Sequence, residues 1–130
     1  MKSLIVEDDL TSRVLMNEIL RAYGVVDVVT NGKESVEAVR AAIEKHSPYD
    51  LICLDIMMPE MDGKQALNMI RSLETSKGTA SGHGAKIVMT TAVSDIKSIY
   101  EAFENLADGY VVKPIDKAKL QEQLKKLKLL

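Results

Sequence analysis

The sequence predicts an α/β fold in which helices cover both faces of a parallel β-sheet. Short runs rich in β-branched residues alternate with stretches of helical periodicity, and such alternation is typical of parallel sheets. The first, third and fourth runs are apolar throughout, which indicates strands that are buried on both faces. Short, right-handed connections leave few topologies for such a chain. The expected strands are Ser3–Val6, Val25–Thr30, Asp50–Asp55, Lys86–Thr91 and Gly109–Val112.

Five helices are expected from apolar residues that recur three or four positions apart. Their apolar positions are Leu15, Ile19, Ala22 and Tyr23; Val36, Val39 and Ile43; Ala66, Ile70 and Leu73; Ile96, Ile99, Tyr100 and Phe103; and Leu120, Leu124 and Leu127. Three of these helices have suitable N-caps, because the cap side chain can accept a hydrogen bond from a free backbone N–H. These caps are Asn31, Ser94 or Asp95, and Asp116, and Gly24 stands where the first helix should end.

Length and composition describe an ordinary single domain. The 130 residues, 46% apolar and 28% charged, suffice for one hydrophobic core. The net charge of −2 gives no attraction to nucleic acid or anionic membranes. The single cysteine, Cys53, excludes an internal disulfide and a cysteine zinc site, and its apolar surroundings indicate a buried core thiol. No signal peptide and no apolar run long enough to span a membrane are found, so a cytoplasmic location is expected.

One segment, Glu74–Ala85, has no apolar period. It is rich in glycine, serine and threonine, and we expect a long mobile loop there. His83 lies within this segment, and His46 lies before the third strand. No other histidine or cysteine is spaced to join either one, so both are expected to be exposed side chains rather than metal ligands.

Acidic residues follow two of the expected strands. Glu7, Asp8 and Asp9 come directly after the first strand, and Asp55 ends the third. In a doubly wound sheet, ligands bind beyond the carboxyl ends of the strands, where the strand order reverses. If these two strands are neighbours there, each pair of carboxylates repels by about 4 kcal/mol at an effective dielectric constant of about 20. Bound protons or a cation would relieve the repulsion, and carboxylate ligands with several retained waters describe Mg²⁺. Alternatively, the acids at 7–9 are solvated residues that begin a helix.

Polar groups also follow the fourth and fifth strands. Thr90 and Thr91 end the fourth strand, and Lys113 follows the fifth, before Pro114. The bond between Lys113 and Pro114 can be cis, because proline lowers the cost of that isomer. A metal ion, a hydroxyl and an ammonium around one carboxylate suit a group that gains negative charge there, such as a phosphoryl group.

Four motifs resemble those of the response-regulator receiver domain of two-component signalling, in particular single-domain, chemotaxis-type regulators. They are "LIVEDD", "LICLDIMMPEMDG", "IVMTTA" and "GYVVKP", which occur in the family's order within a match from about Ser3 to Leu127. The resemblance implies a flavodoxin-like, doubly wound (βα)5 sandwich whose five-stranded parallel sheet has the order 2-1-3-4-5. It also implies that residues 1–130 form a single receiver domain without an output domain.

The resemblance implies an acceptor and a metal site. Asp55 corresponds to the family's phospho-accepting aspartate, and Glu7 and Asp8 to its acidic pair. Mg²⁺ would be bound by Asp8 directly, by Glu7 through water, by Asp55 and by the backbone carbonyl of Met57. Asp9 would fall outside this pair, at the start of the first helix.

Three further residues correspond to the family's catalytic and switch positions. Lys113 corresponds to the lysine that pairs with the phosphoryl group. Thr91, rather than Thr90, corresponds to the switch hydroxyl, and Tyr110 to the aromatic residue that changes rotamer with activation. Met57 and Val93 occupy positions that in this family line the route of the attacking water. Because both side chains are apolar, we expect a long-lived phosphorylated form.

The implied function is a phosphorylation-activated signalling switch. A sensor histidine kinase or a histidine phosphotransfer protein would supply the phosphoryl group. The chain would not be a conventional enzyme, because it would catalyse only its own phosphorylation and slow dephosphorylation. A downstream target protein would read the surface formed by the fourth helix, fifth strand and fifth helix. Neither direct DNA binding nor membrane binding is expected, and the basic last helix leaves a homodimer open.

Two other functions fit the same expected sheet. A flavodoxin-like electron carrier would need a phosphate loop rich in serine, threonine and glycine after the first strand, where this chain has "EDD". An Mg²⁺-dependent aspartyl-phosphate hydrolase would be expected to have a second aspartate two positions after the first. In this chain the residue two positions after Asp55 is Met57. A metal-free scaffold is a third alternative.

Overall fold

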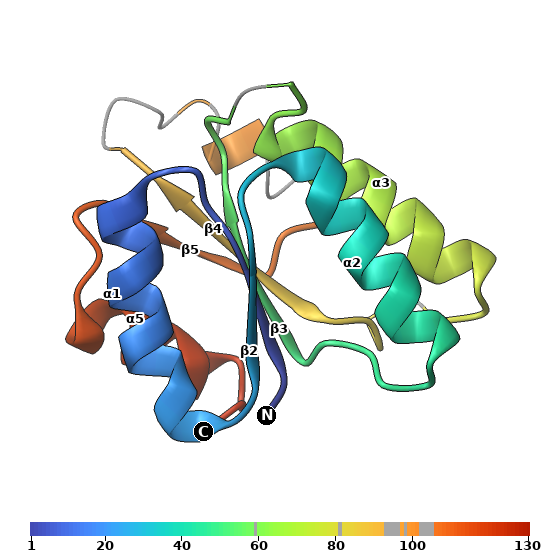
Figure 1. Ribbon diagram of the computed structural model, residues 1–130, viewed down its shortest axis with the longest axis horizontal. Helices are drawn as coiled ribbons and strands as arrows, with labels where there is room; N and C mark the ends of the chain where they lie inside the picture. The colour runs from blue at the N-terminus through green and yellow to red at the C-terminus, as the bar shows by residue number, and fades with distance from the viewer. Residues whose placement is uncertain (59, 81, 93–96, 98, 102–105) are drawn as a thin grey trace.

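The structure is a computed structural model and describes residues 1–58, 60–80, 82–92, 97, 99–101 and 106–130. Five parallel strands form one sheet in the order β2-β1-β3-β4-β5, and helices lie on both of its faces (Figure 1). The predicted fold class and strand order are therefore confirmed. The strands are β1 (Ser3–Val6), β2 (Val26–Val29), β3 (Leu51–Asp55), β4 (Lys86–Thr91) and β5 (Gly109–Val112).

Burial follows the position of each strand in the sheet. β1 and β3 are buried throughout, and β4 is buried from Ile87 onward, as their apolar runs predicted. β2 lies at an edge, and its Asp27 and Val28 are exposed. β2 is one residue shorter at each end than predicted, and β3 begins one residue later.

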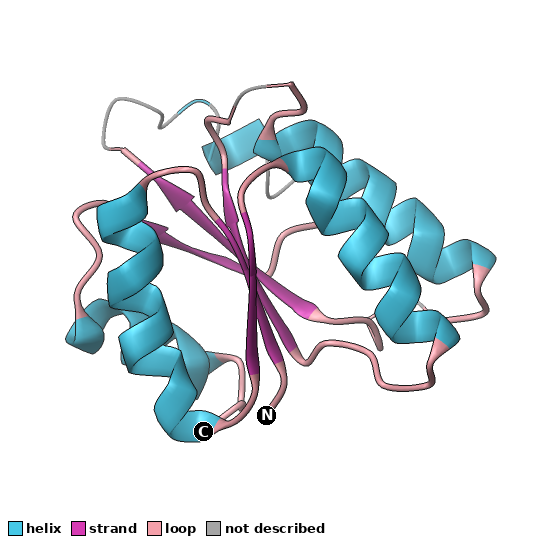
Figure 2. Ribbon diagram, viewed as in Figure 1, coloured by secondary structure: helices cyan, strands magenta, loops and turns pink. Residues whose placement is uncertain are grey.

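Helices lie on both faces of the sheet in the part of the chain that the structure describes (Figures 1 and 2). α1 (Leu10–Leu20) and α5 (Lys117–Lys126) lie on one face, and α2 (Gly32–Glu44) and α3 (Gly63–Ser76) lie on the other. A short 3-10 helix follows α1 and ends at Gly24, whose φ of 147° suits glycine. Residues 97 and 99–101 are also helical. No helix among the described residues is long and apolar enough to cross a membrane.

Each of these four helices begins at a side chain that accepts a hydrogen bond from a backbone N–H of the first turn. The N-caps are Asp9, Asn31, Asp62 and Asp116. The predicted caps Asn31 and Asp116 are confirmed, and Asp62 forms a capping box with Gln65. The predicted cap at Ser94 or Asp95 and the apolar positions Ile96 and Phe103 lie outside the described residues.

The buried face of α1 differs from the predicted one. Met16, Ile19 and Leu20 are buried, whereas Leu15 is 38% exposed and Ala22 is exposed. The prediction for Leu15 and Ala22 was wrong. Positions 16, 19, 20 and 23 also follow a helical spacing, i, i+3, i+4 and i+7, so periodicity alone could not separate the two faces.

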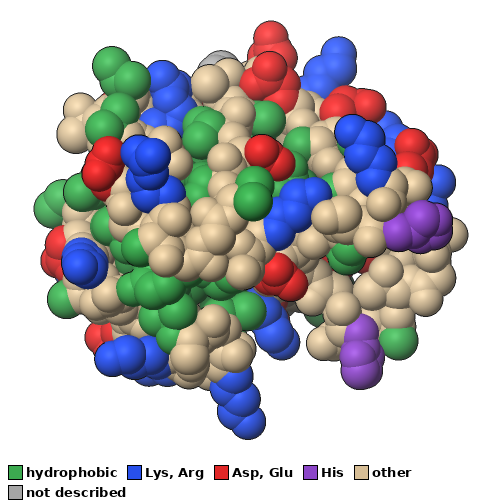
Figure 3. All heavy atoms as spheres, turned by 60° about the horizontal axis from the view of Figure 1, so that its bottom comes forward, with side chains coloured by type: hydrophobic (Ala, Val, Ile, Leu, Met, Phe, Trp, Pro, Cys, Tyr) green, Lys and Arg blue, Asp and Glu red, His purple; other side chains and the backbone are tan. Residues whose placement is uncertain are grey.

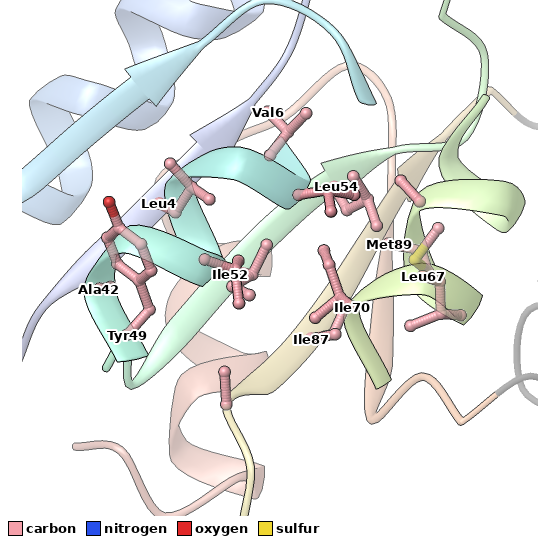
Figure 4. Packing of buried hydrophobic residues seen from close by; sticks show 14 of the residues in the cluster. Leu4, Val6, Ala42, Tyr49, Ile52, Leu54, Leu67, Ile70, Ile87 and Met89 are labelled. Carbon is pink, nitrogen blue, oxygen red and sulfur yellow. The ribbon is translucent and has the colours of Figure 1, made fainter. Parts of the chain in front are cut away.

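Alternate residues of the strands pack into two separate cores. Leu4, Ile52 and Met89 belong to the core beneath α2 and α3 (Figure 4). The other core lies beneath α1 and α5, and its strand residues are Ile5, Leu51, Cys53, Val88 and Val111. Burial raises the pKa of the Cys53 thiol to about 12, in agreement with the predicted core cysteine. Side chains alternate along a strand, so a residue two positions after Ile5, Cys53 or Val88 points toward the same face of the sheet, the one covered by α1 and α5.

The predicted loop Glu74–Ala85 is shorter than expected, because α3 continues to Ser76. Glu74 is buried, accepts a hydrogen bond from the Ala85 N–H at 2.8 Å and pairs with Arg71 at 2.8 Å. Placing Glu74 in a loop was therefore wrong, since its polar character reflects a buried ion pair. Both histidines are exposed, as predicted, and appear as purple side chains on the surface in Figure 3.

Candidate functional site

The carboxyl ends of β1 and β3 meet at one edge of the sheet. Val6 pairs with Leu54, so Glu7, which follows β1, lies next to Asp55, the last residue of β3. Ile5 and Cys53, two positions earlier, belong to the core beneath α1 and α5, so both acidic side chains project toward that side. Glu7 is fully buried, Asp55 is 3% exposed and Asp8 is exposed. One carboxylate oxygen from each of the three residues lies within 4.8 Å of the others. The structure thus brings together the three acidic residues that the sequence singled out.

Lys113 reaches this acidic cluster from the end of β5, across β4. Its bond to Pro114 is cis. The ammonium nitrogen lies 2.8 Å from Glu7 Oε1 and 3.4 Å from Asp55 Oδ2. The lysine therefore pairs more closely with Glu7 than with Asp55.

Burial and charge change the proton affinity of this cluster. Burial, together with the hydrogen bond and negative charge of Glu7, raises the pKa of Asp55 to about 8, although Lys113 and the Met57 N–H act in the opposite direction. Burial acts to lower the pKa of Lys113, but its hydrogen bond to Glu7 and the charge of Asp55 outweigh burial and raise it. Without a metal ion, a proton on Asp55 relieves the repulsion between the carboxylates.

The backbone that follows β3 packs closely around Asp55. The Met57 N–H donates a hydrogen bond to Asp55 Oδ1 at 3.2 Å. Gly63 N–H donates to the carbonyl of Ile56 at 2.9 Å. A Cβ at Gly63 would lie 2.2 Å from the carbonyl oxygen of Asp55, so only glycine allows α3 to begin this close to the site. Pro59 of the same motif lies outside the described residues.

The turn between β1 and α1 is fixed by Asp9 and Arg13. Asp9 lies at the start of α1, where the resemblance placed it, and is the N-cap of this helix; its own N–H donates to Glu7 Oε2 at 3.3 Å. Arg13 Nη1 donates to the backbone carbonyls of Glu7 at 3.4 Å and Asp8 at 3.3 Å. The sequence reasoning missed Arg13, because only the folded turn brings those carbonyls to the guanidinium.

The predicted switch residues lie on the two strands beyond β3. Thr91 is the last residue of β4, is 1% exposed and donates a hydrogen bond to the Ala92 carbonyl at 3.1 Å. Tyr110 on β5 pairs with Met89 and is 39% exposed. Thr90, to which the family resemblance assigns no role, is fully buried. It is the partner of Asp55 in the register of β3 and β4. Val93 lies outside the described residues.

The acidic cluster has the chemistry of a site for a hard divalent cation. Glu7, Asp8 and Asp55 offer only oxygen ligands, which Mg²⁺ prefers over nitrogen and sulfur. Exposed Asp8 leaves one side open to solvent, so bound water or a phosphate oxygen could complete the coordination. Within the described part of the chain, no second group of three potential metal ligands is found.

Fold and site together define a class: a doubly wound α/β protein with an acidic cation site where its strand order reverses. Residues 3–125 match the family of the response regulator receiver domain, and the chain belongs to this family. It is a receiver domain of the kind found in two-component systems. Receiver domains are signalling switches rather than conventional enzymes.

Relatives of very different length share this domain. The chain is 32% identical over 119 residues, 91% of its length, to the transcriptional regulatory protein ZraR of Klebsiella oxytoca, but spans only 24% of that protein. It is 32% identical over 125 residues, 95% of its length, to the chemotaxis protein CheY of Bacillus subtilis and spans 93% of it. The solved receiver domain of the sensor histidine kinase PA1611 from Pseudomonas aeruginosa PAO1 is similar with a TM-score of 0.76 and 25% identity, over 96% of this chain and 94% of that one. In that structure a magnesium ion is coordinated in the active site cleft.

Proposed function

We propose that this receiver domain is a phosphorylation-activated signalling switch in which Asp55 accepts a phosphoryl group and Mg²⁺ is the cofactor. A sensor histidine kinase or a histidine phosphotransfer protein supplies the phosphoryl group from a phosphohistidine. The observation that carries the proposal is the position of Asp55, a buried carboxylate at a strand end, 3.4 Å from the Lys113 ammonium and within 4.8 Å of ligand atoms of Glu7 and Asp8.

Each residue of the site has a separate task. An Asp55 oxygen forms a bond to phosphorus while the bond from phosphorus to the histidine nitrogen breaks, and the electron pair leaves with the imidazole. Lys113 offsets the negative charge of the phosphoryl oxygens. Glu7, Asp8, Asp55 and the Met57 carbonyl would hold Mg²⁺, which neutralises charge and orients the phosphoryl group when bound.

The output is a population shift at a surface away from Asp55. Phosphorylation favours the state in which Thr91 moves toward the phosphoryl group and Tyr110 turns inward. The surface of the fourth helix, β5 and α5 then changes, and a downstream target protein binds it. Support comes from the order of the strands, because β4 and β5 lie directly beyond β3. A cytoplasmic location stays a prediction.

Incubation with acetyl phosphate and Mg²⁺, followed by intact mass measurement, tests the proposal. The wild-type protein should gain the mass of one phosphoryl group, and Asp55→Asn should gain none. Omission of Mg²⁺ should abolish the gain in the wild type. Equal labelling of wild type and Asp55→Asn would place the acceptor elsewhere, and no labelling of the wild type would contradict the function.

A further inference from the structure

Thr90 lies beside Asp55 on the same face of the sheet. The two residues are direct partners in the register of β3 and β4. Cys53 and Val88, two positions earlier on each strand, both belong to the core beneath α1 and α5. Side chains alternate along a strand, so Asp55 and Thr90 both project toward that side. Lys113, which reaches Asp55 from the end of β5, has to cross β4 at this level.

The Thr90 hydroxyl is buried without a partner. Thr90 is 0% exposed, and its Oγ1 has no hydrogen-bond partner among the residues that the structure describes. A buried, unsatisfied hydroxyl costs about 1 to 3 kcal/mol. Valine would fill nearly the same volume without that cost. A hydroxyl at this position is therefore best explained by a partner that it gains in another state of the site.

Asp55 has the acceptor capacity to be that partner. A carboxylate offers about four acceptor positions. Oδ1 accepts one hydrogen bond from the Met57 N–H at 3.2 Å, and Oδ2 has the Lys113 ammonium at 3.4 Å. Neighbouring strands lie about 4.8 Å apart, so rotation about one bond of Thr90 can bring its hydroxyl to a carboxyl oxygen of Asp55.

We propose that the Thr90 hydroxyl donates a hydrogen bond to the Asp55 carboxyl group in the phosphorylated protein and thereby speeds the loss of phosphate. This inference rests on the proposed function, since it concerns the phosphorylated form of Asp55. It adds a residue to the site and does not replace Thr91, which is the next residue along β4.

The chemistry of phosphate loss makes such a donor effective. A water oxygen forms a bond to phosphorus, and the bond from phosphorus to the Asp55 oxygen breaks. The electron pair of that bond stays on Asp55, which leaves as a carboxylate, and both protons of the water stay with the phosphate product. Negative charge therefore grows on the carboxyl oxygens in the transition state, and a hydrogen bond from Thr90 strengthens as the charge grows.

Two substitutions separate the hydroxyl from the shape of the side chain. Wild type, Thr90→Val and Thr90→Ser are phosphorylated with acetyl phosphate and Mg²⁺, the donor is removed, and loss of phosphate is followed by intact mass. We expect Thr90→Val to lose phosphate about tenfold more slowly, as removal of one hydrogen bond to a charged group predicts. Thr90→Ser, which keeps the hydroxyl, should stay within about twofold of the wild type. Thr75→Val removes an exposed hydroxyl on α3 as a matched control and should behave as wild type.

The stability of the same variants shows whether Thr90 acts only in packing. Urea unfolding of the metal-free proteins should find Thr90→Val as stable as the wild type or more stable, because it removes an unpaired buried hydroxyl. Slower phosphate loss without lower stability supports the inference. Equal rates in wild type and Thr90→Val, or equally slow rates in Thr90→Val and Thr90→Ser, overturn it. If the wild type takes up no phosphoryl group, the proposed function itself fails, which is a different result from normal uptake with an unchanged rate of loss.

Discussion

Lys113 faces two carboxylates, and the nearer one is not the proposed acceptor. Its ammonium lies 2.8 Å from Glu7 and 3.4 Å from Asp55, and Glu7 is fully buried. In the metal-free protein the lysine thus compensates the most deeply buried charge of the site. A cation bound between Glu7, Asp8 and Asp55 would take over that compensation and leave the ammonium available to phosphoryl oxygens.

Lys113→Met should lower the free energy of unfolding of the metal-free protein. We expect a loss of about 3 kcal/mol, since removal of one partner leaves the buried carboxylate of Glu7 without a counter-charge. Urea unfolding measures the loss, and added Mg²⁺ should restore part of it. Lys126→Met is the control, because Lys126 and its partner Glu122 are both exposed, so a change under about 0.5 kcal/mol is expected. Equal effects of the two substitutions would contradict this role of Lys113.

Mg²⁺ binding should depend on pH through Asp55. The pKa of Asp55 is raised from 3.8 to about 8, so between these values the folded, metal-free protein holds a proton that the unfolded chain lacks. For this group, stability therefore falls as pH rises through that range. Mg²⁺ has to displace the proton, so its affinity should rise about tenfold per pH unit and level off above about pH 8.

Calorimetry in two buffers of different ionisation enthalpy counts the protons released when Mg²⁺ binds. Close to one proton should be released at about pH 6.5, and almost none at about pH 9.5. An affinity that stays constant across this range would mean that Asp55 is already ionised in the metal-free protein.

At the scale of elements, apolar runs predicted the sheet well, whereas the surfaces of the helices were harder to predict. β1, β3 and β4 are buried on both faces, so most of their residues are apolar. Such continuous apolar runs are easy to recognise as strands in the sequence. α1 has apolar residues at both Leu15 and Met16, and only packing against the sheet decides between them. Glu74 could not be identified as a core residue, because its burial depends on Arg71 and on the Ala85 N–H across a turn.

The start of α3 controls the position of Asp55, and Gly63→Ala tests this. A Cβ at Gly63 would lie 2.2 Å from the Asp55 carbonyl oxygen and 2.7 Å from the Ile56 Cα, both of which are backbone atoms. Because neither atom can rotate away, we expect a loss of stability of about 2 kcal/mol and slower phosphorylation by acetyl phosphate.

Urea unfolding and the rate of mass gain measure the two effects of Gly63→Ala. Ser72→Ala, at an exposed position of the same helix, is the control and should change neither quantity. If Gly63→Ala is phosphorylated at the wild-type rate, α3 does not set the position of the acceptor.

At the scale of the whole molecule, the ends of four strands form one site from residues far apart in the sequence. The motifs singled out Glu7, Asp8, Asp55 and Lys113, which the structure brings together, because each one lies at the end of a strand or just after it. They could not predict that Lys113 pairs first with Glu7, or that Arg13 holds the turn, because these contacts depend on distances between elements. The same sheet links Asp55 to Tyr110 through only β4, which makes a coupled change across three strands physically reasonable.

Phosphorylation should reduce the exposure of Tyr110, which is 39% exposed in this structure. Tyr110 is expected to exchange between an outward-turned state and an inward-turned state. If the phosphoryl group shifts the free-energy difference between them by roughly 3 kcal/mol, an inward-turned state that holds less than one tenth of the molecules becomes the major state. Fluorine NMR of protein labelled with fluorotyrosine measures this change, and Tyr110→Phe assigns the signal. Tyr23, whose hydroxyl accepts a hydrogen bond from Gln121, is an internal control that should not change. If Asp55 is phosphorylated by mass while the Tyr110 signal keeps its position and solvent exposure, the surface change does not pass through this side chain.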